Sequence, residues 1–228
     1  MLKWQIIAHI HNDFTEKFGI PRQSGLVPEL TSLIVFEEPY RNREALRGIE
    51  AFSHLWLLWH FSEAERDGWS PTVRPPRLGG NRRMGVFATR SPFRPNPIGL
   101  SSVKLVGVEE TSEYGVVLRV AGADLMDGTP IVDIKPYLAY TDSHPDAVGG
   151  FADAFVGYAL SVECPEDCLA IVPEEKREGL LAVLAQDPRP SYQHDPERVY
   201  AMSFGGFTVR FTVNETVLSV VEIEHLAP

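Results

Sequence analysis

Short apolar segments separated by glycine, proline and polar residues fill the first two-thirds of the chain. This spacing is typical of β-strands joined by turns, and it contains no long amphipathic helical period. One short helix is expected, over Arg43–Phe52. The predicted strands are Trp4–Ile10, Leu33–Phe36, Leu55–Phe61, Met84–Ala88, Ser101–Val108, Val116–Val120 and Ile131–Ile134. The pattern therefore predicts a mainly β fold whose N-terminal domain is a β-barrel-like closed sheet.

The pattern changes after Tyr140, where the polar segment TDSHPDAVGG is typical of a linker. We therefore expect a domain of residues 1–148 followed by a small α+β C-terminal domain of residues 149–228. In the second domain we predict a strand over Phe155–Val162 and a helix over Pro173–Gln186, with a proline near its first turn. The strict alternation of Phe207–Val213, followed by Val217–Glu224, predicts a β-hairpin.

Composition narrows the classes of protein that remain. The chain has 228 residues, is 44% hydrophobic and carries 31 acidic against 21 basic residues, a formal charge of −10. A non-specific nucleic-acid binder is usually basic throughout, so this chain is expected to bind anions only locally. No segment approaches the roughly 20 apolar residues of a membrane span, and the N-terminus lacks a leader pattern, which predicts a cytoplasmic protein. Cys164 and Cys168 do not have metal or redox spacing and are expected to be free thiols.

Basic residues gather in one segment of this acidic chain. Residues 68–108 contain seven lysines and arginines and no aspartate or glutamate: Arg74, Arg77, Arg82, Arg83, Arg90, Arg94 and Lys104. Within it, Pro92, Pro95 and Pro97 fix φ and stiffen the chain, so this part is predicted to be a rigid loop that holds cations in place. A polyanion or a carboxylate fits such a loop. A solvated face that pairs with the surplus acids remains an alternative for Arg74, Arg77, Arg82 and Arg83.

Common cofactor and hydrolase motifs are absent from the sequence. It contains no GxGxxG, GxxxxGK[ST], HExxH or GxSxG. His54 and His60 lie on one face of a predicted strand, but a third metal ligand is missing, so core histidines are the better interpretation and no metal is expected. The segment Asp127-Gly128-Thr129-Pro130 is typical of a turn, because glycine supplies a positive φ, proline a fixed φ, and aspartate caps free amides. Taken alone, it indicates only a strand connection.

Four segments together resemble the TrmO-type tRNA methyltransferase family. They are RGIEAFSHLWLL (Arg47–Leu58), GWSPTVRPPRLGGNRRMGVFATRSPFRPNPIGLSSVKL (Gly68–Leu105), DLMDGTPIVDIKPYL (Asp124–Leu138) and LAQDPRPSY (Leu184–Tyr192). The similarity extends in order over nearly the whole chain, and its central segment is long.

The resemblance implies an enzyme that uses S-adenosyl-L-methionine on a β-barrel and methylates N6 of threonylcarbamoyladenosine (t6A to m6t6A) at position 37 of tRNA, next to the anticodon. It implies a homodimer with the cofactor near the subunit interface and a tRNA anticodon loop as partner. It also implies cofactor contacts at Ser24, Gly25, Leu26, Ser62, Glu63, Arg90, Leu100, Asp127, Gly128, Thr129 and Pro130.

The catalytic base stays open at the level of sequence. Asp127, Asp133 and His54 are the candidates within the motifs, although a turn aspartate usually caps amides and His54 is flanked by core residues. Arginine suits the threonyl carboxylate or RNA phosphate, and Arg94 or Arg77 is our hypothesis for that contact. In the second domain, Asp187, Arg189 and Tyr192 either stop a helix or touch the anticodon loop.

Two other functions remain open besides the enzyme. One is a non-catalytic RNA-binding barrel, for which the basic segment would suffice. The other keeps the fold and cofactor but acts on a different substrate. Binding of S-adenosylmethionine separates the first from the enzyme.

Overall fold

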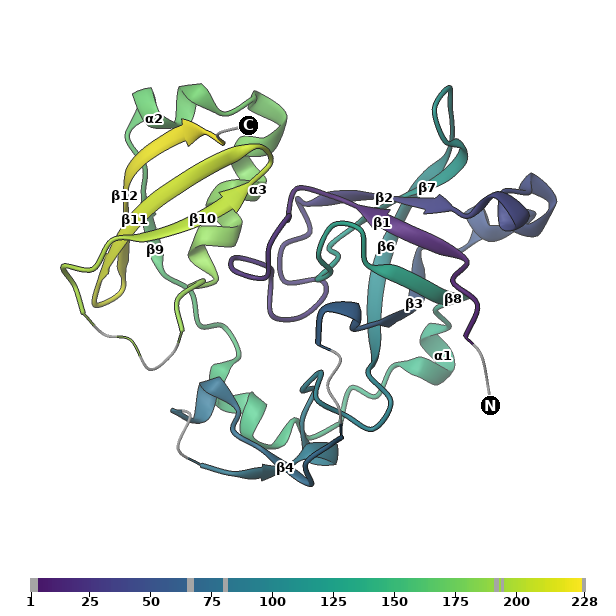
Figure 1. Cartoon of the computed structure of the whole chain (residues 1–228), viewed down its shortest axis with the longest axis horizontal. Helices are drawn as coiled ribbons and strands as arrows, with labels where there is room; N and C mark the ends of the chain where they lie inside the picture. Colours follow the sequence, from purple (N-terminus) through teal and green to yellow (C-terminus); the bar gives the residue numbers. More distant parts are fainter. Residues whose placement is uncertain (1–3, 65–67, 80–81, 191–192, 194, 227–228) are drawn as a thin grey trace.

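The computed structural model describes residues 4–64, 68–79, 82–190, 193 and 195–226. Figure 1 shows a strand-rich N-terminal part and a smaller C-terminal part, with the β4 segment below both. The strands are β1 Ala8–His11, β2 Thr31–Phe36, β3 His54–His60, β4 Thr72–Val73, β5 Met84–Gly85, β6 Ile98–Thr111, β7 Gly115–Ala121, β8 Pro130–Pro136, β9 Ser161–Glu163, β10 Tyr200–Phe204, β11 Phe207–Asn214 and β12 Val217–His225. The α-helices are α1 Ala139–Asp142, α2 Glu166–Ile171 and α3 Glu174–Ala185. The 3-10 helices are η1 Glu38–Tyr40, η2 Arg43–Leu46, η3 Ile49–Ala51, η4 Ser62–Ala64, η5 Pro76–Leu78, η6 Val86–Ala88 and η7 Gly150–Phe155.

Six strands of the N-terminal part close on themselves in the order β1-β2-β7-β6-β3-β8. The ring closes where Ala8 of β1 pairs with Ile131 of β8. Strand β3 shows why these segments form such a sheet, because its alternate residues Leu55, Leu57 and Trp59 are buried and their neighbours face outward. The barrel-like sheet and the mainly β class are confirmed.

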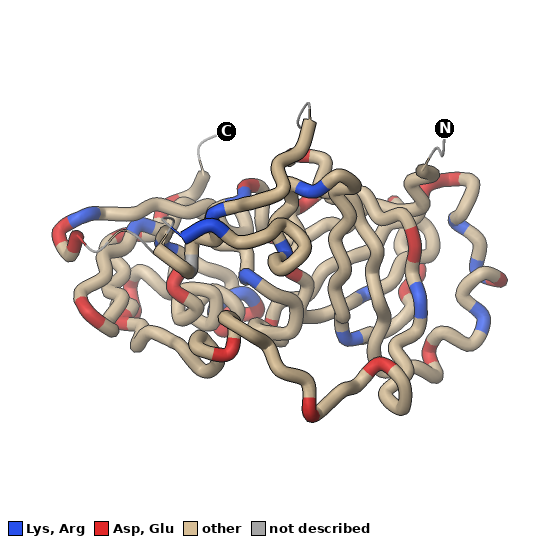
Figure 2. The backbone as a smooth tube through the Cα atoms, turned by 90° about the horizontal axis from the view of Figure 1, so that it is seen from below, with Lys and Arg blue, Asp and Glu red and all other residues tan. Residues whose placement is uncertain are grey.

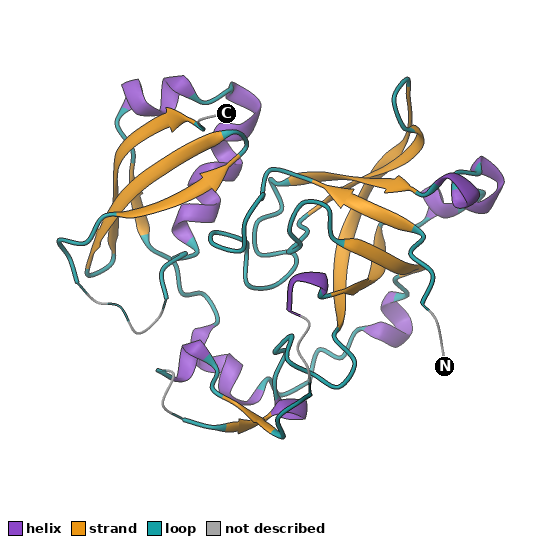
Figure 3. Ribbon diagram, in the orientation of Figure 1, coloured by secondary structure: helices purple, strands orange, loops and turns teal. Residues whose placement is uncertain are grey.

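The C-terminal part is a four-stranded sheet with helices packed against it (Figure 3). Its order is β10-β11-β12-β9, and β9 runs parallel to β12. The expected helix is α3, which begins directly after Pro173 and buries Leu180, Val183 and Leu184. The predicted hairpin is β11 and β12, with Glu215 in the turn at φ +52°. The small α+β architecture is thus confirmed, whereas the boundary at residue 148 stays a prediction.

The connection between β1 and β2, residues 12–30, packs into the C-terminal core although it belongs to the N-terminal part of the sequence. Phe14, Val27 and Leu30 share one buried cluster with residues of α3 and β10–β12. Lys176 of α3 also forms an ion pair with Asp13. This connection therefore joins the two parts through a continuous apolar core.

Several predicted elements differ from the structure. The segment expected as a helix, Arg43–Phe52, forms two separate 3-10 turns, because Gly48 adopts a left-handed φ of +88° between them. Met84–Ala88 is a strand for only two residues before it turns into η6. Residues 150–155 form η7, so the strand expected over Phe155–Val162 is confined to Ser161–Glu163. In the described residues no helix is long and apolar enough to cross a membrane, and both cysteines are free.

Candidate functional site

Asp124 lies at the centre of a hydrogen-bonded group at one end of the closed sheet. The hydroxyl of Ser101, on β6, donates to Asp124 Oδ1 at 2.5 Å, and Trp59 Nε1, on β3, donates to that hydroxyl at 3.0 Å. The backbone N–H of Ser24 also donates to the Asp124 carboxylate. The carboxylate therefore connects two strands of the sheet with the loop of residues 21–26.

Burial raises the pKa of the Asp124 carboxyl above its usual value. The hydrogen bonds from Ser101 and Ser24 and the positive charge of Arg90 oppose this shift without overcoming it. No ion pair with Asp124 is found among the described residues. This carboxylate is therefore more basic than a surface aspartate.

The loop of residues 21–26 is held close to the backbone that leads into Asp124. Gly25, at φ +79°, donates its N–H to the carbonyl of Gly122 at 2.8 Å. A side chain on Gly122 would meet the backbone of Gly25 at 3.3 Å, so glycine permits this close approach. Arg90 Nη1 donates to the side-chain oxygen of Gln23. The structure thus brings Ser24, Gly25 and Arg90 together around Asp124.

The Asp127–Pro130 turn follows Asp124 directly and is fixed to the N-terminal segment. The N–H groups of Asp127 and Gly128 donate to the carbonyls of Phe14, at 2.7 Å, and Ile10, at 2.8 Å. Thr129 is buried, and its hydroxyl donates to the carbonyl of Met126 at 2.6 Å. This part of the turn is therefore preformed.

Ser62, Glu63 and Leu100 are placed differently from the other expected cofactor contacts. Ser62 and Glu63 form η4 after β3, and the carbonyl of Glu63 accepts a hydrogen bond from Lys17 at 2.6 Å. Leu100 is 56% exposed, and it alternates on β6 with the buried Ser101. Its side chain therefore points away from the Asp124 group.

The three candidate bases each have a neighbouring partner. Asp127 Oδ1 accepts the N–H of Asn12 at 3.0 Å and lies 3.3 Å from His11 Nδ1. Asp133 pairs with Lys135 at 2.7 Å. His54 lies on the outer face of β3, with its Nδ1 2.9 Å from the hydroxyl of Ser53. None of the three belongs to the Asp124 group.

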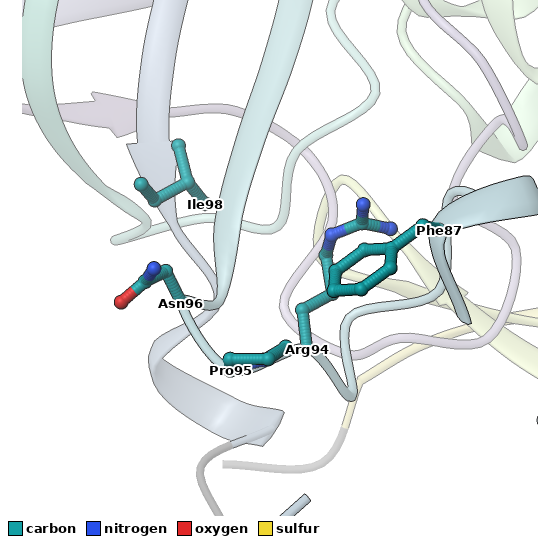
Figure 4. Close-up of a pocket in the computed structure, with 5 residues that line it drawn as sticks. All are labelled: Phe87, Arg94, Pro95, Asn96 and Ile98. Carbon is teal, nitrogen blue, oxygen red and sulfur yellow. The ribbon is translucent and has the colours of Figure 1, made fainter. Parts of the chain in front are cut away.

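Residues 68–97 of the basic segment form an arm that comprises β4, β5, η5, η6 and the proline loop, whereas Lys104 lies on β6 of the closed sheet. Arg94 Nη1 donates to the carbonyls of Val86, at 3.2 Å, and Thr89, at 2.7 Å, so the guanidinium is fixed within the loop. A pocket of about 330 Å³ adjoins it, lined by Phe87, Arg94, Pro95, Asn96 and Ile98 (Figure 4). The side chain of Arg77 lies outside what the structure describes. Elsewhere acidic residues are spread over both parts of the chain (Figure 2).

The C-terminal loop after α3 is organised by an ion pair. Arg189 donates through Nε and Nη2 to the two carboxylate oxygens of Asp187, at 2.8 and 3.0 Å, and both side chains are nearly buried, 8% and 13% exposed. Burial acts to raise the pKa of Asp187, but hydrogen bonds and charge from Arg189, with the hydroxyl of Tyr158, outweigh it and leave that pKa lowered. Tyr192 lies outside the described residues.

This loop also contacts the loop of residues 21–26. Arg22 Nη2 donates to the backbone carbonyls of Asp187, at 3.2 Å, and Arg189, at 2.9 Å. The two loops therefore share a direct polar contact between the parts of the molecule.

Sequence reasoning missed Asp124, Ser101, Trp59 and Gln23 as members of one site. Asp124 stood inside a quoted motif, and its signal was a carboxylate directly after the apolar strand of residues 116–120. The contact of Ser101 with Asp124 depends on the closed sheet and carries no local sequence signal. No group of metal-ligating side chains is found in the described part of the chain.

Comparisons with known proteins agree with this architecture. The family model described as the tRNA-methyltransferase O N-terminal domain matches residues 9–143, and the TrmO C-terminal domain model matches residues 159–226. The chain is 44% identical to the tRNA (adenine(37)-N6)-methyltransferase of Escherichia coli, covering 97% of each chain. It is 44% identical to a putative S-adenosylmethionine-dependent methyltransferase, RcsF, of Pseudomonas aeruginosa, covering 86% of each. A crystal structure of TrmO from P. aeruginosa matches with a TM-score of 0.81 at 34% identity, over 99% of this chain and 97% of that one. The chain therefore belongs to the tRNA-methyltransferase O (TrmO) family.

Proposed function

We propose that this protein transfers a methyl group from S-adenosylmethionine to N6 of adenine 37 in tRNA, and that the natural substrate is threonylcarbamoyladenosine at that position. The observation that carries the proposal is the convergence of the 21–26 loop, Arg90 and the segment from Asp124 to Pro130 at one end of the sheet. Its family relative in E. coli is named for the reaction at adenine 37.

The residues at this place suit the proposed cofactor. S-adenosylmethionine supplies an electrophilic methyl group on a sulfonium cation, and it also carries an ammonium, a carboxylate and ribose hydroxyls. Arg90 suits the carboxylate, while the Asp124 and Asp127 carboxylates suit the cationic and hydroxyl groups. We propose that Ser24–Leu26, Ser62, Glu63, Arg90, Leu100 and Asp127–Pro130 hold the cofactor.

The protein's part in the chemistry is mainly positioning. Because a sulfonium is already an activated leaving group, methyl transfer depends most on in-line alignment of the nucleophilic nitrogen. The proton on that nitrogen needs an acceptor, and Asp127, Asp133 and His54 stay proposed candidates. Asp124 is added to the proposed cofactor contacts, and its hydrogen bonds also fix the 21–26 loop relative to β6.

Recognition of the tRNA is assigned to the arm. Arg94 is held rigidly by two carbonyls beside a pocket, which suits a carboxylate or phosphate that must be gripped in one orientation. We propose Arg94, with Arg77, for the threonyl carboxylate or RNA phosphate.

A homodimer is part of the proposal. Leu100 and Val106 are exposed apolar residues on β6, at 56% and 51%, on the outer surface of the sheet. An outward-facing Leu100 can serve as a cofactor contact if a second copy lies against this strand. We also propose a cytoplasmic location, which the proposed tRNA substrate supports.

The deciding experiment combines cofactor binding with nucleoside analysis. The purified full chain is incubated with S-adenosylmethionine and with tRNA that carries or lacks threonylcarbamoyladenosine, and the nucleosides are identified by mass spectrometry. We expect a product one methyl group heavier from the modified tRNA only. Cofactor binding without a tRNA product would indicate a different substrate, and absence of cofactor binding in calorimetry would indicate an RNA-binding module.

A further inference from the structure

Two large aromatic side chains of the arm face solvent next to each other. Trp69 precedes β4 and is 54% exposed, and Phe87 follows β5 and is 72% exposed. Their ring centroids lie 6.1 Å apart with 32° between the ring planes. The pairing of Thr72 with Gly85 between β4 and β5 holds the two rings together.

Arg94 adds a fixed cation to this pair. Its guanidinium carbon lies 5.8 Å from the centroid of the Phe87 ring, within the range of a cation–π contact. Figure 4 shows the Arg94 side chain alongside that ring, next to the pocket of about 330 Å³. The Trp69–Phe87 pair with Arg94 is called the aromatic platform below.

The segment that carries the aromatic platform contains basic residues and no acidic ones. Residues 68–108 hold no aspartate or glutamate, and Arg74, Arg82 and Arg83 of this segment are exposed. Arg83 Nη1 donates to the hydroxyl of Thr72 at 3.1 Å, which ties a cation to the β4–β5 hairpin. In a chain with a formal charge of −10, flat apolar rings and basic residues thus lie together in one acid-free segment.

We propose that the aromatic platform stacks against unpaired bases of the anticodon loop that flank the target adenosine. Single-stranded nucleic acid presents flat bases next to phosphates, and proteins bind it through aromatic side chains set in a basic surface. The charge around Trp69 and Phe87 favours this polyanion over a second copy of the acidic chain. The proposal rests on the proposed tRNA substrate and assigns bases, rather than only phosphates, to this surface.

The test measures binding of a labelled anticodon stem–loop to the full chain by fluorescence anisotropy at several salt concentrations. Phe87→Ala and Trp69→Ala are each expected to raise Kd about tenfold, and Phe87→Tyr and Trp69→Phe are expected to retain binding, because stacking needs a ring. The slope of log Kd against log salt should not change in the alanine variants. Arg74→Gln should lower that slope, because a cation near phosphate releases counterions. Tyr140→Ala, which removes an 87% exposed aromatic from α1, is the matched control.

Several outcomes would overturn the aromatic platform. Unchanged Kd in both alanine variants while the wild type binds and methylates tRNA would reject the platform and leave the proposed function intact. A weaker self-association of the alanine variants in sedimentation, with RNA affinity unchanged, would make the surface a contact between copies. Failure of the wild type to bind or methylate tRNA would reject both. Equal melting temperatures for Phe87→Ala and wild type keep a folding defect out of the comparison.

Discussion

Asp124 and Asp187 are both largely removed from solvent, but their surroundings are opposite. Asp187 accepts two hydrogen bonds from the guanidinium of Arg189, and its pKa is lowered. Asp124 is bonded by a hydroxyl and a backbone N–H, has Arg90 only as a more distant charge, and its pKa is raised. Because Arg189 neutralises its charge, Asp187 belongs to the structural framework. The Asp124 carboxylate has no paired cation among the described residues and can still bind a cation or a hydrogen-bond donor.

The contrast separates two roles, stabilising the fold and binding the cofactor, on the two sides of the 21–26 loop. The Asp187–Arg189 pair fixes the C-terminal loop, which in turn receives Arg22 from the loop of residues 21–26. The Asp124 group fixes the other side of that same loop. Changes to the Asp187–Arg189 pair should therefore mainly lower stability, whereas changes to Asp124 should mainly weaken cofactor binding.

The largest effect is expected from Arg189→Ala. Removing one partner of a nearly buried pair leaves Asp187 uncompensated and should lower the free energy of unfolding by about 3–5 kcal/mol, measured by urea denaturation. Because the folded pKa of Asp187 is lowered, its contribution is present above the unfolded value of about 3.9 and is lost as pH falls through the folded pKa. The deficit should thus shrink in acid. Arg210→Ala, which breaks exposed ion pairs with Glu222 and Glu224, should leave stability nearly unchanged; an equal loss there would contradict the contrast.

Gly99→Ala should disturb the Asp124 group by displacing Trp59, which donates a hydrogen bond to Ser101. A Cβ at Gly99 would lie 2.1 Å from the ring of Trp59, so this ring must move and its bond to Ser101 should break. We expect a loss of about 1–3 kcal/mol in unfolding free energy and weaker cofactor binding. Gly107→Ala on the same strand is the control, since its Cβ would meet nothing within 4 Å. Retained S-adenosylmethionine affinity in Gly99→Ala would separate Trp59 from the site.

Asp124→Asn should weaken S-adenosylmethionine about tenfold, the expected effect of losing a charge-assisted hydrogen bond, as measured by calorimetry. Stability should not fall at pH 7. The raised folded pKa means that wild-type stability declines as pH rises from about 3.9 through that pKa, and asparagine removes this decline. Glu109→Gln, whose carboxylate pairs with Arg119 and belongs to no proposed site, serves as the control with unchanged affinity. A stability loss at pH 7 in Asp124→Asn, with affinity intact, would reverse the assignment.

The smallest effect is expected from Arg22→Ala, which removes the contact between the loops. We expect about 1 kcal/mol less stability and about threefold weaker cofactor binding, because the 21–26 loop loses its hydrogen bonds to the C-terminal loop. Arg177→Ala removes bonds to the carbonyls of Val172 and Ala170 within the C-terminal part. Arg177→Ala should lower stability without changing the affinity for the cofactor. If both variants lose cofactor affinity, the effect of Arg22→Ala is not specific to the 21–26 loop.

Local patterns predicted most of the framework. Alternation identified β3 and β11, and proline and leucine spacing identified α3, because these signals depend on residues next to each other in the chain. The short strand β10, Tyr200–Phe204, was not predicted, although its buried positions alternate as in the others. The two 3-10 turns within residues 43–51 resembled one helix because the sequence does not show that Arg47 and Gly48 leave the helical conformation between them.

The candidate site depends on contacts over long sequence distances. Motif similarity pointed to Ser24, Arg90 and Asp127, and the structure gathers the first two around Asp124. The role of Asp124 depends on a contact with Ser101, 23 residues earlier, and on a loop 100 residues away, neither of which leaves a local pattern. The aromatic platform was missed because an exposed tryptophan and phenylalanine resemble ordinary strand residues until their exposure is known.

The packing of residues 12–30 into the C-terminal core has a consequence for the order of folding. Phe14, Val27 and Leu30 emerge early from the ribosome, but their partners on α3 and β10–β12 follow more than 140 residues later. The loop beside Asp124 therefore cannot acquire all its contacts until synthesis is nearly finished. During that interval the apolar side chains of residues 12–30 lack their partners in the C-terminal core. We therefore expect a slow or chaperone-dependent final folding phase.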